Sequence, residues 1–112
     1  MNKRQKHPAV GDYYYHYKHN PKSEINNFAY EIIGIGHHTE IDGLSESAMV
    51  IYAPLYEESS VYQNDKHFNI RPLDMFVSKV TKNEKTFSRF KRVTNIDTIA
   101  KLQKIKKKLY KK

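Results

Sequence analysis

The sequence predicts a mainly β protein: a small antiparallel sheet, curled as an SH3-like barrel or a related barrel, with a C-terminal α-helix. Short aromatic and β-branched runs recur along the first 93 residues, and such runs favour strands. Glycine, proline and asparagine occupy several of the intervals between these runs, as is typical of turns. After residue 93 the apolar residues adopt a helical spacing, which indicates one terminal helix.

The expected strands follow one another along the chain. They lie at residues 12–18, 28–36, 48–52, 67–70, 77–80 and 86–93, with a helical turn at 73–76 and a hairpin turn at 82–84. Alternation divides the first strand between two faces, with Tyr13, Tyr15 and Tyr17 on one and Tyr14, His16 and Lys18 on the other. The terminal helix is expected from about Asp97 to about Tyr110, with a capping sequence before it.

The length of 112 residues suits one domain. We expect a disordered leader over residues 1–10, a β-rich domain over 11–93 and a basic helix or tail over 94–112. The net charge of +8 is concentrated at the end of the chain. Seven of the 20 Lys and Arg residues fall within the last 12 positions, where there is no acid, so the first 100 residues carry 13 bases against 12 acids. A fragment ending at Ala100 is therefore expected to fold without the tail.

Composition excludes several classes of function. The chain has no cysteine, so it has no disulfide framework, thiolate zinc site or cysteine nucleophile. It also has no apolar stretch of the length that a signal peptide or a membrane span needs. We therefore expect a cytoplasmic protein with no membrane partner.

Several motifs, in order and at compatible spacing, resemble the bacterial domain-of-unknown-function family one-six-five-three (DUF1653). They are Tyr15-His16-Tyr17-Lys18, Tyr30 through Gly36 with His38-Thr39-Glu40, Val50-Ile51-Tyr52 with Leu55-Tyr56, Arg71-Pro72-Leu73 with Met75-Phe76, and Arg89-Phe90. The resemblance covers roughly Gly11 to Phe90. Ile41 stands where the family has a threonine, and residues 20–27 look like an insertion. The family has no settled activity, so the resemblance implies site residues rather than a reaction.

The candidate ligand-binding residues are polar members of these motifs: His16, Lys18, His38, Glu40, Arg71 and Arg89. Histidine and carboxylate spacing does not match a metal motif, so no metal and no cofactor are expected. His38 and Glu40 would share a face if they lay on a strand, and a carboxylate can orient an imidazole that acts as a general base. The chain shows no nucleophile motif or phosphate loop, which favours a protein without catalytic activity.

Arginine presents a rigid fork that suits phosphate or carboxylate. Arg71 and Arg89 are therefore candidates for binding an anion. The interpretation that we favour for Arg71, however, is a structural ion pair with Asp74, Glu40 or Glu31 that ties a loop to the sheet.

Nucleic acid is the leading partner that the sequence predicts. Lysines contact phosphates without regard to sequence, and tyrosines offer surfaces on which bases stack. The lysines in question are Lys101, Lys104, Lys106, Lys107, Lys108, Lys111 and Lys112. The sequence thus predicts a non-catalytic module that binds RNA or DNA, or another polyanion, through this tail and an aromatic face. A small enzyme using His38 and Glu40, and a protein–protein adaptor, remain as alternatives.

Overall fold

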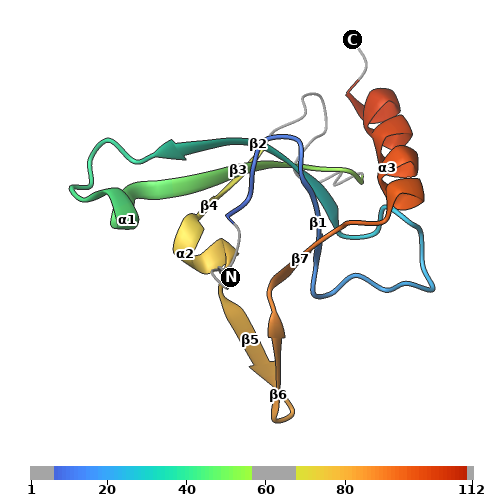
Figure 1. Ribbon diagram of the computed structural model, residues 1–112, viewed down its shortest axis with the longest axis horizontal. Coiled ribbons are helices and arrows are strands. Elements are labelled where there is room, and N and C mark those ends of the chain that lie inside the picture. The colour runs from blue at the N-terminus through green and yellow to red at the C-terminus, as the bar shows by residue number, and fades with distance from the viewer. Residues whose placement is uncertain (1–6, 57–67, 111–112) are drawn as a thin grey trace, which may run out of the picture.

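The computed structural model describes residues 7–56 and 68–110 (Figure 1). The main sheet is antiparallel, with strand order β4-β3-β2-β1-β7. Its strands are β1 (Tyr13–His16), β2 (Ala29–His37), β3 (Ala48–Pro54), β4 (Asn69–Pro72) and β7 (Phe90–Arg92). The other elements are the hairpin strands β5 (Lys79–Lys82) and β6 (Lys85–Ser88) and the helices α1 (Leu44–Ser47), α2 (Leu73–Phe76) and α3 (Ile96–Leu109). The predicted mainly β fold with a C-terminal helix is confirmed.

The sheet curls but does not close into a barrel among the described residues. Figure 1 shows the hairpin β5–β6 projecting away from the main sheet. Arg89 links the two, because its amide donates to the Ser78 carbonyl at the base of the hairpin and its carbonyl accepts from the Tyr17 amide beside β1. At the tip, Asn83 and Glu84 both have positive φ, 52° and 65°, as a two-residue hairpin turn requires. The predicted hairpin turn is therefore confirmed.

Aromatic side chains dominate the first core, which lies where α2 packs against β3. Phe76 of α2 stacks on Phe90 of β7, with ring centroids 4.1 Å apart and planes 6° apart. Tyr14 and Tyr52 meet Phe76 edge-on at 5.2 and 5.4 Å. Edge-to-face and offset pairs add to the stability that burial alone gives. Tyr14 thus faces this core, as the alternation of the first strand predicts.

Val50 on β3 is fully buried in the same core. We expect Val50→Ala to lower the free energy of unfolding by about 1–3 kcal/mol, because it leaves unfilled space in a packed interior. His38→Ala and Glu40→Ala alter exposed residues and should change it by less than about 0.5 kcal/mol. Urea denaturation of the three variants tests this. A loss in the polar variants as large as that of Val50→Ala would show that the loop is structural.

The second core lies between the opposite face of the sheet and α3. Leu102 is fully buried against Tyr13 and Leu55, and Ile99 and Ile105 flank it on the same helical face. Asn95 caps the helix, because its side-chain oxygen accepts from the Thr98 amide at 2.9 Å. The helix expected from about residue 97 to about 110 is confirmed within one residue at each end.

Polar contacts also tie α3 to the sheet. Lys106 Nζ lies 2.6 Å from Glu31 Oε1, and the Glu31 side chain is only 10% exposed. The Tyr110 hydroxyl donates to the Pro54 carbonyl at 2.7 Å. Burial and then the Glu31 carboxylate raise the pKa of Tyr13 to about 12. These contacts oppose the expectation that a fragment ending at Ala100 folds, since the residues beyond it complete a core.

Some sequence predictions fall outside the described residues. These are the leader as far as residue 6, His67 of an expected strand, and the last two lysines, Lys111 and Lys112. None of the described helices combines the length and the apolar character needed to cross a bilayer.

Candidate anion-binding site

The fold brings four of the six predicted ligand-binding residues together. His16 ends β1, Lys18 follows it, Arg71 lies on β4, and Arg89 lies at the bend between β6 and β7. The positive charges of Arg71, Lys18 and Arg89, and that of Lys82 at the end of β5, all act on the His16 imidazole. We refer to these five residues as the basic cluster.

Phe90 forms the floor of the basic cluster. The His16 ring meets it edge-on at 5.1 Å, and the Arg71 guanidinium carbon lies 5.5 Å from its centroid. Tyr52 meets the same ring edge-on at 5.5 Å. Because Phe90 is buried, the guanidinium is attracted to an aromatic face that is shielded from water, where a cation–π contact is strongest.

The Nε–H group of each arginine donates a hydrogen bond to a hydroxyl group of the protein. Arg71 Nε donates to the Tyr52 hydroxyl at 3.0 Å, and Arg89 Nε donates to the Ser78 hydroxyl at 3.0 Å. No other hydrogen bond is recorded for either guanidinium within residues 7–56 and 68–110. Anchoring at Nε fixes the plane of each fork and leaves its terminal nitrogens for a ligand, and a planar fork binds phosphate oxygens in pairs.

The expected ion pair of Arg71 is wrong for all three proposed partners. Within the described part of the chain, Arg71 meets no carboxylate within 4.0 Å. Glu31 pairs instead with Lys106 on the helix side of the sheet, while Asp74 and Glu40 are exposed. The sheet register explains the result, because it pairs Arg71 with Val50 on the strand that also supplies Tyr52. A hydroxyl and an aromatic ring thus hold Arg71 where a carboxylate was expected.

His16 is neutral at pH 7. Burial, followed by the charges of Arg71, Lys18, Arg89 and Lys82, lowers its pKa from 6.5 to about 4. Nδ1 of the ring accepts from the Lys18 amide at 3.2 Å, so the proton of the neutral imidazole resides on Nε2. Among the described residues, the charges that act on His16 are all positive.

The lowered pKa of His16 makes stability depend on pH. Between pH 6.5 and about 4 the unfolded chain binds a proton that the folded chain excludes, so stability falls as the pH falls through this window. We expect a contribution on the order of 1 kcal/mol, reduced from the full shift because the ring is partly exposed to solvent. His16→Asn keeps an acceptor near Nδ1 and removes the titration. Urea denaturation at pH 7 and 4.5 should show a smaller loss for His16→Asn, and equal losses would contradict this account.

The sequence did not predict two features of the site. Lys82, at the end of β5, joins the cluster because its Nζ lies 5.2 Å from the centroid of the Tyr17 ring. Phe28 has φ of 54°, an uncommon backbone conformation for an aromatic residue. Its carbonyl accepts from the His16 amide, and its ring lies 5.7 Å from the imidazole. Strain of this kind often accompanies a binding site, and no sequence pattern marked it.

An open groove of about 760 Å³ adjoins the basic cluster and shares His16 with it. Tyr15, Tyr17, His19 and Phe87 supply aromatic walls, and Lys91 supplies a positive charge. Tyr15 and His19 are themselves stacked, with centroids 3.6 Å apart. Unstacked nucleic-acid bases bind to surfaces of this composition.

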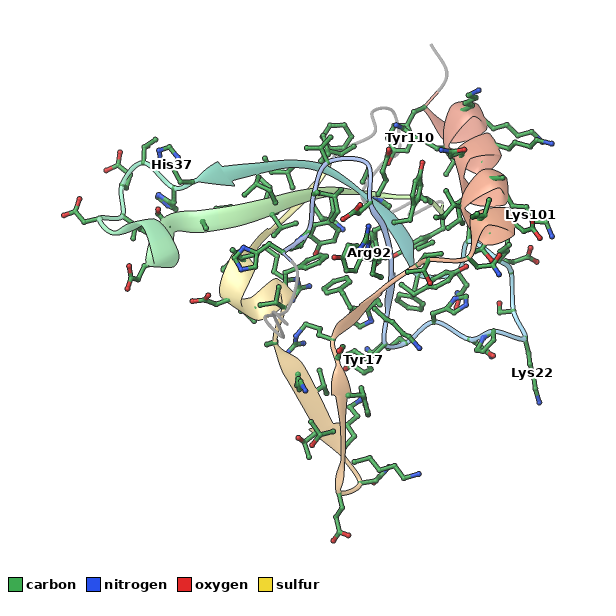
Figure 2. The ribbon with its side chains drawn as sticks, in the orientation of Figure 1. Tyr17, Lys22, His37, Arg92, Lys101 and Tyr110 are labelled. Carbon is green, nitrogen blue, oxygen red and sulfur yellow. The ribbon has the colours of Figure 1, made fainter. Side chains whose placement is uncertain are left out.

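The structure separates His38 and Glu40 from the basic cluster. Figure 2 shows His37, at the end of β2, near the left edge of the view, well apart from Tyr17 below its centre. Because β2 ends at His37, the idea that His38 and Glu40 share a strand face is wrong. Nδ1 of His38 accepts from the Glu40 backbone amide at 3.1 Å, a local turn contact. The described residues also contain no group of three or more His, Asp or Glu side chains that could hold a metal ion.

The lysines of α3 divide into two groups. Lys106 pairs with Glu31, so its assignment to a nucleic-acid surface stays a prediction. The exposed lysines lie on the face away from Leu102, where Figure 2 shows Lys101 pointing outward. They are Lys101, Lys104, Lys107 and Lys108.

The fold and site define a small mainly β protein with a carboxylate-poor basic cluster on an aromatic floor. Residues 12–92 match the family described as protein of unknown function (DUF1653), and the chain belongs to that family. All five residues of the basic cluster fall within the match, whereas α3 begins four residues after it. No curated protein and no solved structure matches the chain.

Proposed function

We propose that the protein is a non-catalytic binding module for a phosphate-bearing polyanion, with single-stranded nucleic acid as its leading partner. One observation carries the proposal: the positive charges of Arg71, Lys18, Arg89 and Lys82 all act on the His16 imidazole, and none of the charges that act on it from the described residues is acidic. Mutually repelling charges held together without counter-charges favour an anionic ligand. The two arginine forks supply the directional contacts, and the lysines supply attraction that is independent of sequence.

The groove and α3 support nucleic acid over a compact anion alone. The aromatic walls beside His16 suit bases, which stack on such rings whatever their identity. The exposed lysine face of α3 extends the positive surface beyond the groove, since Lys101 follows the groove residue Thr98 by one helical turn. No contact among the described residues favours catalysis by His38 and Glu40 or an adaptor role, so both stay predictions.

Fluorescence anisotropy with a labelled single-stranded oligonucleotide tests the proposal at increasing salt. Affinity should fall steeply, with a slope of about −0.7 in log–log form for each phosphate that a cation neutralises. Lys82→Ala should weaken binding and make the slope shallower by about 0.7. Lys85→Ala is the matched control, since Lys85 pairs with Lys82 across the hairpin and is not among the charges that act on His16.

Equal effects of the two lysine substitutions would place binding outside the basic cluster. Absence of binding at low salt would contradict the nucleic-acid proposal itself.

A further inference from the structure

The basic cluster holds more positive charge than one internal phosphate of a nucleic acid can balance. Arg71, Arg89, Lys18 and Lys82 each carry a permanent charge, and each acts on the same imidazole. An internal phosphodiester carries one negative charge and offers two unesterified oxygens. A phosphate monoester carries about 1.5 to 2 negative charges at pH 7 and offers three oxygens.

The donors of the cluster also match a monoester in number. Arg71 and Arg89 each leave two terminal nitrogens without a recorded partner among the described residues, because Nε makes the contact to the protein. His16 adds Nε2–H, since Nδ1 already accepts from the Lys18 amide. Two forks and a ring donor are enough to reach all three free oxygens of a monoester, whereas a diester presents only two.

We infer that the basic cluster binds a phosphate monoester dianion in preference to an internal phosphodiester, as a terminal phosphate would present it. The source is either the end of a nucleic-acid strand, with the adjoining groove holding the first bases, or a free phosphorylated small molecule. The first source rests on the proposed function, and the second does not.

Anisotropy with matched oligonucleotides tests the inference. Three single-stranded decamers of one sequence carry a 5′-phosphate, a 3′-phosphate or no terminal phosphate, with the label on a central base. We expect one of the phosphorylated strands to bind at least ~10-fold more tightly than the hydroxyl strand. That advantage should disappear in Lys82→Ala and in the double variant Arg71→Ala/Arg89→Ala. It should persist in Lys104→Ala, which weakens all three strands alike.

Competition with a nucleoside 5′-monophosphate and with inorganic phosphate distinguishes the end of a nucleic-acid strand from a free phosphorylated small molecule as the source of the monoester.

NMR of the His16 ring gives an independent readout, because a bound dianion among Arg71, Lys18, Arg89 and Lys82 should raise the pKa of His16 above its value of about 4. Thermal melts of each variant establish that it is folded. If Arg71→Ala/Arg89→Ala does not fold, Lys82→Ala carries the comparison.

Each pattern of results has a definite meaning. Equal affinity for the three strands, with no displacement by the monophosphate, overturns the inference and leaves the proposed function standing. If no strand binds but the monophosphate or phosphate raises the pKa of His16, the inference stands and the nucleic-acid part of the proposed function falls. If neither strands nor small phosphates bind, both are overturned.

Discussion

A chain that ends at Ala100 is expected to be unfolded or partly folded at room temperature. The truncation removes Leu102 and Ile105 from the second core and exposes Tyr13 and Leu55, which they cover. Burying each large apolar side chain stabilises a protein by about 1.5–3 kcal/mol. The truncation also removes the Lys106–Glu31 ion pair, which contributes up to about 1 kcal/mol because the lysine is partly exposed. Together these losses approach the entire stability of a small domain, about 5–15 kcal/mol.

Circular dichroism during heating, together with amide NMR spectra, measures the effect of this truncation. A chain ending at Tyr110 is the matched control, because it removes two lysines and keeps every described contact of α3. It should melt like the full-length protein. A cooperative melt of the Ala100 truncation within a few degrees of full length would show that α3 is a separable tail.

The double variant Arg71→Ala/Arg89→Ala is expected to reduce affinity for a single-stranded oligonucleotide by about 100-fold or more. Each arginine supplies hydrogen bonds from a charged group, worth about 1.5–3 kcal/mol, and ten-fold in affinity corresponds to about 1.4 kcal/mol. Stability should change little, because neither arginine has a carboxylate partner within residues 7–56 and 68–110. The protein loses only the Nε contacts to Tyr52 and Ser78 and the cation–π contact to Phe90.

The variant Arg71→Lys distinguishes the contribution of the planar guanidinium group from that of the positive charge alone. Lysine keeps the charge but has neither the planar fork nor the Nε anchor, so Arg71→Lys should restore only a small part of the affinity lost in Arg71→Ala. The melting temperatures of both should lie close to that of wild type. A loss of 3–5 kcal/mol in Arg71→Ala would instead indicate a buried ion pair.

Local sequence features predicted the elements of the fold well. The tyrosine alternation correctly placed Tyr14 and His16 on the face opposite Tyr13 and Tyr15, because the period of a strand depends only on neighbouring residues. The helical spacing and the cap at Asn95 located α3 for the same reason. A separable tail stays a prediction, and the burial of Leu102 in the second core opposes it.

The site could be predicted only in part. The family-like motifs named His16, Lys18, Arg71 and Arg89, but nothing in the sequence shows that strand pairing gathers them and leaves His38 and Glu40 outside. Distant pairing also decides the partner of Arg71, since β4 lies beside β3 and its Tyr52. Lys82 belongs to the cluster because its ammonium group lies over the Tyr17 ring. These two residues are far apart in the sequence, so no local pattern predicts the contact.

The central claim is that the basic cluster is the place where this protein binds anions. Titration of isotopically labelled protein with an unlabelled single-stranded oligonucleotide, followed by NMR of the arginine Nε–H and histidine ring signals, tests it most directly. The account predicts that the signals of Arg71, Arg89 and His16 shift first and saturate together. Shifts confined to the lysines of α3, with Arg71 and Arg89 unchanged at saturation, would contradict it.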